Sequence, residues 1–468
     1  MFPIALLSLF AAQADVAPPV PPAPYAAPAP AEADQRSARR ESIEEEMEAI
    51  EERARWDLFK RSPDQRSPLP YERYLAAKDH VGRMAGYSSV RRYAAGNKNS
   101  KSALIGSWEE LGPGNIGGRT RSWLLDPTNP DIQYAGAVSG GVWKSVDGGR
   151  TWKPLTDFLA NIGVTTLAFD PKNTRVIYAG TGESFASNFR GFGIFRSTDA
   201  GATWEHLAST RNSNFFFVNK LVVSPVDSSR LYAATTTGLF RSLDAGASWT
   251  RVIDTGCQEI AYRTDQPNDY LFVSCPATAG LPAGATIFRN TNAGGDGAWE
   301  PVFTADNMGR TSLAVAPSNQ AVVYAMAAYR INGELSNSFL AIYRSTSNGD
   351  RDSWERRAHR EDGNRINATI LSNPLLNWAD ICGTGTRGWS NQGSYDNVIA
   401  VDPTNPEILW AGGIDLFRSN DGGLTFGFAS DWAVNPTFRT YVHADQHAIV
   451  FHPQYDGVNN KTLYAAGD

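Results

Sequence analysis

The octet SVDGGRTW at residues 145–152 recurs along the chain and decides the fold. The other copies are STDAGATW at 197–204, SLDAGASW at 242–249, SNDGGLTF at 419–426 and, with two-residue insertions, NTNAGGDGAW at 290–299 and STSNGDRDSW at 345–354. Self-similarity at about 45 to 55 residues is typical of architectures built from one small repeated unit. In the octet, the Asp side chain can accept hydrogen bonds from the turn backbone, and Gly tolerates positive φ. Each octet is therefore predicted to close a tight turn.

A second repeated unit, with the pattern strand, polar turn, strand, precedes the octets. Examples are LLDPTNPDIQYAG from Leu124, LAFDPKNTRVIYAG from Leu167 and IAVDPTNPEILWAG from Ile399. These two strands, the strand leading into the octet and the strand that begins at its aromatic residue make a four-stranded antiparallel unit. The sequence thus predicts an all-β propeller of about seven four-stranded blades over residues 108–468. The seventh copy begins at Ala448 and carries only its first two strands, so we expect an incomplete last blade and a chain truncated at its carboxyl end.

The composition agrees with this fold and excludes other classes of protein. Charged residues make up 20% of the chain and aromatic residues 11%, and there are 42 glycines, which is the profile of an all-β protein with many turns. The 43 basic and 49 acidic residues give a net charge of −6. This balance provides no electrostatic footprint for nucleic acid, so no nucleic-acid partner is expected.

The amino-terminal residues have the composition of export and spacer segments. Residues 1–14 hold an apolar run that ends in the small-x-small pattern of a signal-peptidase site, although no Lys or Arg precedes it. A buried amino-terminal segment is the alternative. Residues 15–34 form a Pro/Ala-rich spacer, and residues 35–107 carry apolar residues at helical spacing. We expect a secreted or periplasmic protein with no integral membrane segment after signal cleavage.

Two of the three cysteines are placed for a disulfide. Cys257 and Cys275 bracket two strand-like runs around a polar turn, and each lies nine residues from Gln266. A symmetric hairpin would place them opposite one another, so a cross-strand disulfide is predicted. Cys382 would then remain as a free buried thiol.

The octets resemble the Asp-box, S-x-D-x-G-x-T-W, of bacterial neuraminidase repeats. The segment from WEELGPGNIGGRTRSW at residue 108 to the first octet also resembles the start of secreted bacterial propellers related to the sortilin amino-terminal domain and to xyloglucanase-type glycoside hydrolases. The resemblance covers residues 108–468 and implies that Asp147, Asp199, Asp244 and Asp421 are structural turn residues. Because Asp-boxes occur in enzymes and in non-enzymes, the resemblance leaves the function open.

In such a propeller, the segments entering the innermost strands share one axial face with the loops between the second and third strands. Arg119 and Arg121 alternate before the first inner strand, where they could bind a carboxylate or form structural ion pairs. The loop at 180–193 carries Glu183 and Arg190 among aromatic residues, a mixture suited to binding sugars but also compatible with a simple surface loop.

A long extension from about residue 359 to 395 also falls on this face. Its Trp378 and Trp389 are candidates for ligand binding, because long loops at a scaffold rim often carry function. The xyloglucanase family uses two Asp residues as acid and base, and Asp396 resembles the placement of one of them. The second Asp would fall in the loop between the second and third strands of the first repeat, where this chain has Ser139. This departure argues against xyloglucanase chemistry.

His443, Asp445 and His447 alternate before the seventh repeat. An extended backbone would direct all three to one side. A structural polar cluster, a ligand-binding or catalytic set and a divalent-metal site all remain open for them. No cofactor is expected, no metal site is assigned, and nothing in the sequence indicates the oligomeric state.

Two functions follow. The first is a secreted propeller that binds an extracellular protein or glycan ligand on its axial face without catalysis. The alternative is a glycoside hydrolase acting on an extracellular polysaccharide, with its acid and base drawn from Asp396, Glu183 and Asp445. Two carboxylates about 5 to 10 Å apart across an open groove would favour hydrolysis, whereas burial in ion pairs would favour binding.

Overall fold

The computed structural model describes residues 119–468 apart from 157–162, 186–188, 277–283, 331–335, 373–390 and 433–439. The expected signal segment, spacer and helical extension lie outside the described residues. So do Trp378, Trp389 and Cys382. No described helix is long and apolar enough to cross a membrane.

The described residues form six four-stranded antiparallel sheets and one two-stranded sheet, and within each sheet neighbouring strands are consecutive in sequence. We number these sheets as blades 1 to 7 in chain order. Their strands are β1 Thr120–Leu125, β2 Gln133–Ala137, β3 Gly141–Ser145 and β4 Lys153–Pro154; β5 Val164–Asp170, β6 Asn173–Thr181, β7 Ile194–Ser197 and β8 Glu205–His206; β9 Val218–Val223, β10 Leu231–Thr235, β11 Gly238–Ser242 and β12 Thr250–Ile253; β13 Glu259–Arg263, β14 Tyr270–Cys275, β15 Thr286–Asn290 and β16 Glu300–Thr304; β17 Met308–Val315, β18 Val323–Tyr329, β19 Phe339–Ser345 and β20 Trp354–His359; β21 Val398–Val401, β22 Leu409–Gly412, β23 Leu416–Ser419 and β24 Gly427–Phe428; and β25 Ala448–Phe451 and β26 Leu463–Ala466.

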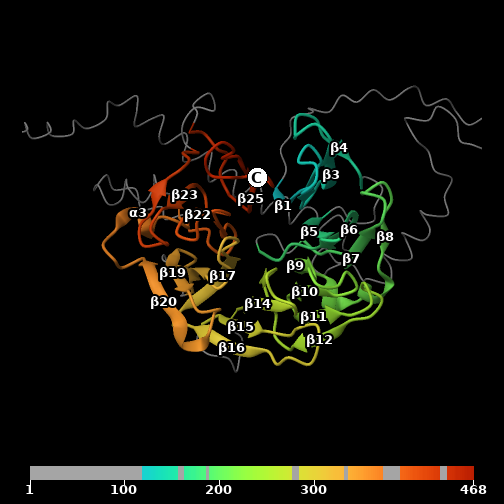
Figure 1. The fold of residues 1–468 in the computed structure, drawn as a ribbon, viewed down its shortest axis with the longest axis horizontal. Helices are drawn as coiled ribbons and strands as arrows, with labels where there is room; N and C mark the ends of the chain where they lie inside the picture. The colour runs from blue at the N-terminus through green and yellow to red at the C-terminus, as the bar shows by residue number, and fades with distance from the viewer. Residues whose placement is uncertain are drawn as a thin grey trace, which may run out of the picture. The chain divides into compact units, whose positions relative to one another are not determined.

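The sheets are arranged as propeller blades. The first strands β1, β9, β17 and β25 lie toward the middle, and the fourth strands β4, β8, β12, β16 and β20 lie outside (Figure 1). Short helices occur only between strands in the described part: 3₁₀ turns at Ala208–Thr210, Ser213–Phe215 and Arg351–Ser353, and α3 at Arg365–Ala368. The all-β propeller is thereby confirmed, with six complete blades and a partial seventh.

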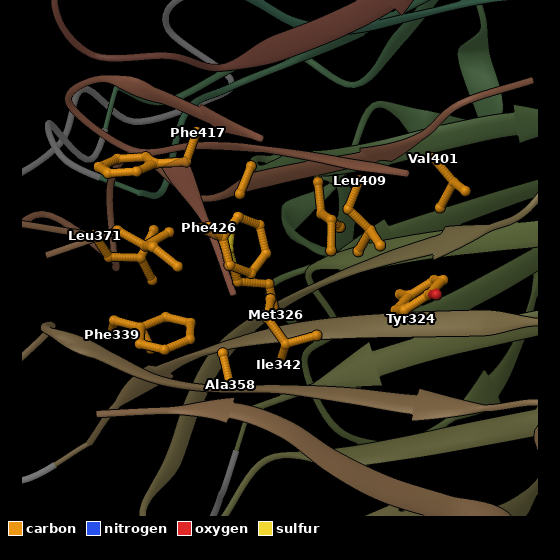
Figure 2. Close-up of a cluster of buried hydrophobic side chains, with 14 of the residues drawn as sticks. Tyr324, Met326, Phe339, Ile342, Ala358, Leu371, Val401, Leu409, Phe417 and Phe426 are labelled. Atoms are coloured by element: carbon orange, nitrogen blue, oxygen red, sulfur yellow. The ribbon is translucent and has the colours of Figure 1, made fainter. Parts of the chain in front are cut away.

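The hydrophobic cores lie between neighbouring blades. Figure 2 shows the core between blades 5 and 6, where Met326 and Phe339 from blade 5 face Leu409 and Phe417 from blade 6. All four of these side chains are fully buried. Because the second strand of a blade is covered on both faces, strands such as β10 and β14 are buried over their whole length, whereas the fourth strands, such as β12 and β16, are partly exposed.

The Asp-box turns connect the third and fourth strands. In blade 1, Asp147 Oδ1 accepts hydrogen bonds from the Ser145 hydroxyl at 2.8 Å and the Thr151 amide at 2.9 Å, while its Oδ2 accepts one from the Thr151 hydroxyl at 2.6 Å. These bonds lower the pKa of Asp147 to about 2. The same set of contacts recurs around Asp199, Asp244 and Asp421. The octets of blades 1, 2, 3 and 6 thus share one turn motif, built on the side chains of Ser, Asp and Thr or Ser.

Cys257 and Cys275 form a disulfide in blade 4. They are not directly opposite one another in the ladder, because Glu259 pairs with Ser274 and the register is displaced by one residue from the symmetric hairpin. The Cys257 amide donates instead to Thr235 in blade 3. The disulfide therefore lies where blade 3 passes into blade 4.

Candidate site at the mouth of the channel

The inner strands of all seven blades surround an axial channel of about 650 Å³. Polar side chains occupy the start of these strands, one from each blade, and we call them the polar collar. Its members are Arg121, Thr165, Asn219, Gln258, Arg310, Asn397 and His447. In sequence, most of them stand five residues before the residue that opens the turn to the second strand. The repeat therefore brings residues that are far apart in sequence to one end of the channel.

β-Bulges mark this position in four blades. The ladder register shifts between Thr120 and Ser122 in blade 1, and equivalent shifts flank Thr165 in blade 2 and Asn219 in blade 3. In blade 5 the shift lies between Met308 and Thr311 and includes Arg310. A bulge leaves one residue unpaired and changes the direction of its side chain. This local irregularity allows polar groups to leave the sheet and line the channel.

Glu183 connects two arginines at the mouth. Its backbone forms an isolated bridge with Phe189 in the loop between β6 and β7. Its fully buried carboxylate accepts from Arg121 Nη2 at 2.5 Å and from Arg119 Nη1 at 3.3 Å. A buried carboxylate between two guanidinium groups is held in its ionised form. These contacts favour a structural role for Glu183 over acid catalysis.

His447 is held as a neutral imidazole. Arg121 Nη1 donates to its Nδ1 at 2.9 Å, which leaves the proton on Nε2, and Nε2 donates to Asp468 Oδ1 at 2.7 Å. Burial, and then the charge of Arg121, lower the pKa of His447 to about 3. The contact of 3.4 Å between His447 Nδ1 and Asp396 Oδ1 is therefore not an ion pair.

Asp468 is the second ionised carboxylate of the mouth. Burial alone would raise its pKa, but hydrogen bonds from His447 and from the Tyr395 hydroxyl, at 2.6 Å, lower it to about 2. Arg119 Nε lies 3.4 Å from its Oδ1. Its side chain retains 23% exposure, whereas that of Glu183 has none.

Asp396 and Asp445 carry two carboxyl groups that lie close enough to influence one another's pKa. Asp396 is completely buried, and no N–H or hydroxyl group of the described residues donates to either of its oxygens. Burial, then repulsion from Asp445 and a hydrogen bond shared with it, raise the pKa of Asp396 well above its usual range. Burial also raises the pKa of Asp445 to about 6. Two adjacent carboxyl groups cannot both ionise at low cost, so the pair retains a proton.

Asp445 is also unusual in its backbone, with φ at +68°. A left-handed conformation at a non-glycine residue costs about 1–3 kcal/mol and is concentrated at functional sites. It also interrupts the extended backbone expected over residues 443–447. The expectation that His443, Asp445 and His447 project to one side was therefore wrong: His443 is exposed, whereas His447 is buried in the network with Arg121.

The other predicted site residues are placed as follows. Arg119, Arg121, Glu183, Asp396 and His447 come together at the mouth. Arg190 instead lies over the ring of Phe216, with 3.6 Å between its guanidinium carbon and the ring centroid. Ser139 is exposed in the turn between β2 and β3. Among the residues that the structure describes, no group of three His, Cys, Asp or Glu side chains is placed to hold a metal ion.

Sequence reasoning missed Arg310, Tyr395 and Asp468. Tyr395 lies under both arginines, 4.9 Å from Arg119 and 4.6 Å from Arg121, and burial raises its pKa. For Arg310 a signal existed, because it stands next to the repeat position already occupied by Arg121 and His447. Aligning the repeats on their inner strands, instead of on their octets, would have revealed it.

The sequence shows similarity to known xyloglucanases. The chain is 25% identical to xyloglucanase Xgh74A of Acetivibrio thermocellus over 411 residues, which cover 77% of this chain and 44% of that protein. It is 27% identical to the xyloglucanase of Hypocrea jecorina over 366 residues, which cover 72% of this chain and 41% of that protein. The chain is an Asp-box β-propeller related to the glycoside hydrolase family 74 xyloglucanases.

This relationship extends over only part of those enzymes, since the chain spans less than half the length of the curated relatives it matches. The fold resembles that of an ancestral family 74 enzyme, with a TM-score of 0.52 and 18% identity over 77% of this chain and 46% of that one. That likeness supports the fold alone. No family model matches the sequence.

Proposed function

We propose that this protein acts in glycoside hydrolysis of an extracellular polysaccharide, which it binds at the mouth of the channel. The similarity to xyloglucanases supports a glycan-directed role. The observation that carries the proposal is the pair of Asp396 and Asp445, whose buried carboxyl oxygens lack hydrogen-bond donors among the described residues and influence one another's pKa. We also infer, from the signal-like pattern at residues 1–14, that the protein is secreted or periplasmic.

Glycoside hydrolysis requires a carboxylic acid that still holds its proton near neutral pH. Asp445 suits this role because its pKa is about 6 and, unlike Asp396, its side chain is only partly covered. Asp396 is the positioning residue, since burial and the charge of Asp445 raise its own pKa, so that a protonated carboxyl group lies beside Asp445. Asp468 is the candidate for the second carboxylate, because it is ionised and partly exposed.

The experiment measures release of reducing ends from xyloglucan and from a panel of other plant and microbial polysaccharides. Asp445→Asn is expected to lower the rate by about 10²- to 10⁴-fold, the usual contribution of a general acid. Asp415→Asn is the matched control, because burial also raises the pKa of Asp415 to about 6, but it is bound by the Ser430 hydroxyl and the Trp432 amide in blade 6. Full activity in Asp445→Asn, or no release by the wild-type chain from any substrate, would overturn the proposal.

A second candidate is binding of an extracellular glycan or protein ligand without catalysis. It is favoured by the burial of Glu183 between two arginines and by Ser139 at the position where the family resemblance places a second carboxylate. Retained affinity for a polysaccharide that the wild-type chain does not cleave would support this candidate over hydrolysis.

A further inference from the structure

Arg310 differs from the other arginines at the mouth because it has no carboxylate partner among the described residues. Its Nη1 donates to the carbonyl oxygens of Ser394, at 3.1 Å, and Tyr395, and its Nη2 donates to that of Asn397 at 3.2 Å. All three acceptors belong to the segment that leads into blade 6. They therefore engage the Nη1–Nη2 end of the guanidinium group.

The opposite edge of this guanidinium group is unused. In the described part of the chain, Arg310 Nε donates to no residue, and one Nη2 hydrogen is also left over. Nε–H and Nη2–H point in parallel from one edge of arginine, with the spacing of the two oxygens of a carboxylate. Arg310 lines the channel and is only partly buried.

The surroundings favour an anion at this place. The ring of Phe185 lies near two cations, with its centroid 4.1 Å from the guanidinium carbon of Arg310 and 5.2 Å from that of Arg121. Burial, and then the charge of Arg121, lower the pKa of Arg310 to about 9. The carboxylates of Glu259, Asp396 and Glu183 act on Arg310 without contacting it. A bound carboxylate would neutralise this charge, which is otherwise costly in the channel.

We propose that the free edge of Arg310 binds the carboxylate of an acidic sugar, so that the polysaccharide recognised at the mouth contains uronic acid residues. This inference rests on the proposed function, which supplies the glycan. An acidic sugar fits better than a neutral one because hydroxyl groups can satisfy single donors but cannot neutralise the guanidinium charge. The ring of Phe185 adds an apolar surface beside the carboxylate site.

The test measures binding of digalacturonate and of its neutral counterpart galactobiose to the full chain by titration calorimetry. Wild type is expected to bind digalacturonate more tightly, and Arg310→Gln to weaken that binding by about 10- to 100-fold while leaving galactobiose binding unchanged. Arg310→Lys keeps the charge but not the paired donors, so it should keep only part of the preference, and it gives a second measurement if Arg310→Gln does not fold. Arg196→Gln is the control, because Arg196 pairs with Glu205 on the outside of blade 2.

Equal affinity of wild type for the two sugars, or an unchanged preference in Arg310→Gln and Arg310→Lys, would overturn the inference. A short peptide with a free carboxyl terminus separates sugar from protein ligands. Binding of that peptide, but not of digalacturonate, would overturn the assignment to an acidic glycan. Cleavage of a neutral polysaccharide that depends on Asp445, without any binding of digalacturonate, would overturn this inference and leave the proposed function standing.

Discussion

Substitution of Glu183 separates a structural role from a catalytic one. In the structure this carboxylate is fully buried and accepts from Arg121 at 2.5 Å and Arg119 at 3.3 Å, whose side chains are 3% and 14% exposed. Glu183→Gln keeps the shape but removes the charge, and its amide nitrogen would face a guanidinium group. Breaking a buried ion pair on one side costs about 3–5 kcal/mol, because the remaining charge stays buried without compensation.

The expected result is a large loss of stability. A change of about 3–5 kcal/mol corresponds to about a 10²- to 10⁴-fold shift in the unfolding equilibrium. Urea unfolding followed by tryptophan fluorescence would measure this shift as a lower midpoint. Glu205→Gln is the matched control, since Glu205 also pairs with an arginine, at 3.0 Å, but its side chain is 68% exposed. An exposed pair of this kind is worth about 0–1 kcal/mol.

The result that would refute this reasoning is a Glu183→Gln variant with the unfolding midpoint of Glu205→Gln. The burial of the carboxylate would then not require the two arginines. If such a stable variant also lost hydrolytic activity, Glu183 would return as a catalytic carboxylate and the structural role assigned to it would be wrong.

Three further predictions concern pH, the disulfide and the core. Because the pKa of Asp445 is raised, its contribution to stability is lost as pH rises from about 4 to about 6. Because the pKa of His447 is lowered, its contribution is lost as pH falls from about 6.5 to about 3. Thermal unfolding between pH 4 and 6 should therefore give a slope of stability against pH that is more positive than that of wild type in Asp445→Asn and more negative in His447→Asn; slopes like that of wild type would contradict the assignment. Replacing Cys257 and Cys275 by Ser, which opens a loop with a sequence separation of 18, should cost about 3 kcal/mol in urea unfolding, and a loss below 1 kcal/mol would argue against the cross-link. Phe417→Ala, in the fully buried core between blades 5 and 6, should cost about 3–5 kcal/mol in the same assay, and a cost near zero would mean that the core collapses around the gap.

The fold could be predicted from the sequence because the residues that form each octet turn are close together in sequence. Asp147 forms its bonds within four residues, to Ser145 and Thr151, so the residues that make the turn are adjacent in sequence. The same residues therefore produce the same turn wherever they occur, and the spacing between octets indicates how many residues make one blade. The strands preceding the octets followed from apolar runs and Pro-containing turns in the same way.

The candidate site was predictable only in part, because its contacts are distant in sequence. The loop carrying Glu183 and the strand carrying Arg121 could be assigned to one face, but their ion pair depends on the bulge at Arg121, which no residue pattern indicates. The left-handed backbone of Asp445 was likewise invisible, since alternation in sequence assumes an extended strand. Burial decides which carboxyl group is ionised, and burial depends on how neighbouring blades pack. The repeats in the sequence indicate each blade separately and do not show this packing.

In this propeller the residues that form the turns are separate from those that line the channel, so one repeat can carry different side chains in the channel. The octet lies between the third and fourth strands, and the side chains of its Ser, Asp and Thr bond within the turn, away from the residues that line the channel. The polar collar lies at the start of the inner strands, where a bulge frees one side chain from the ladder. A substitution there changes the lining of the channel but leaves the turn intact. Thr165 and Arg121 illustrate the result: they occupy the same place in consecutive blades, yet one is a neutral hydroxyl and the other carries the charge that organises the mouth.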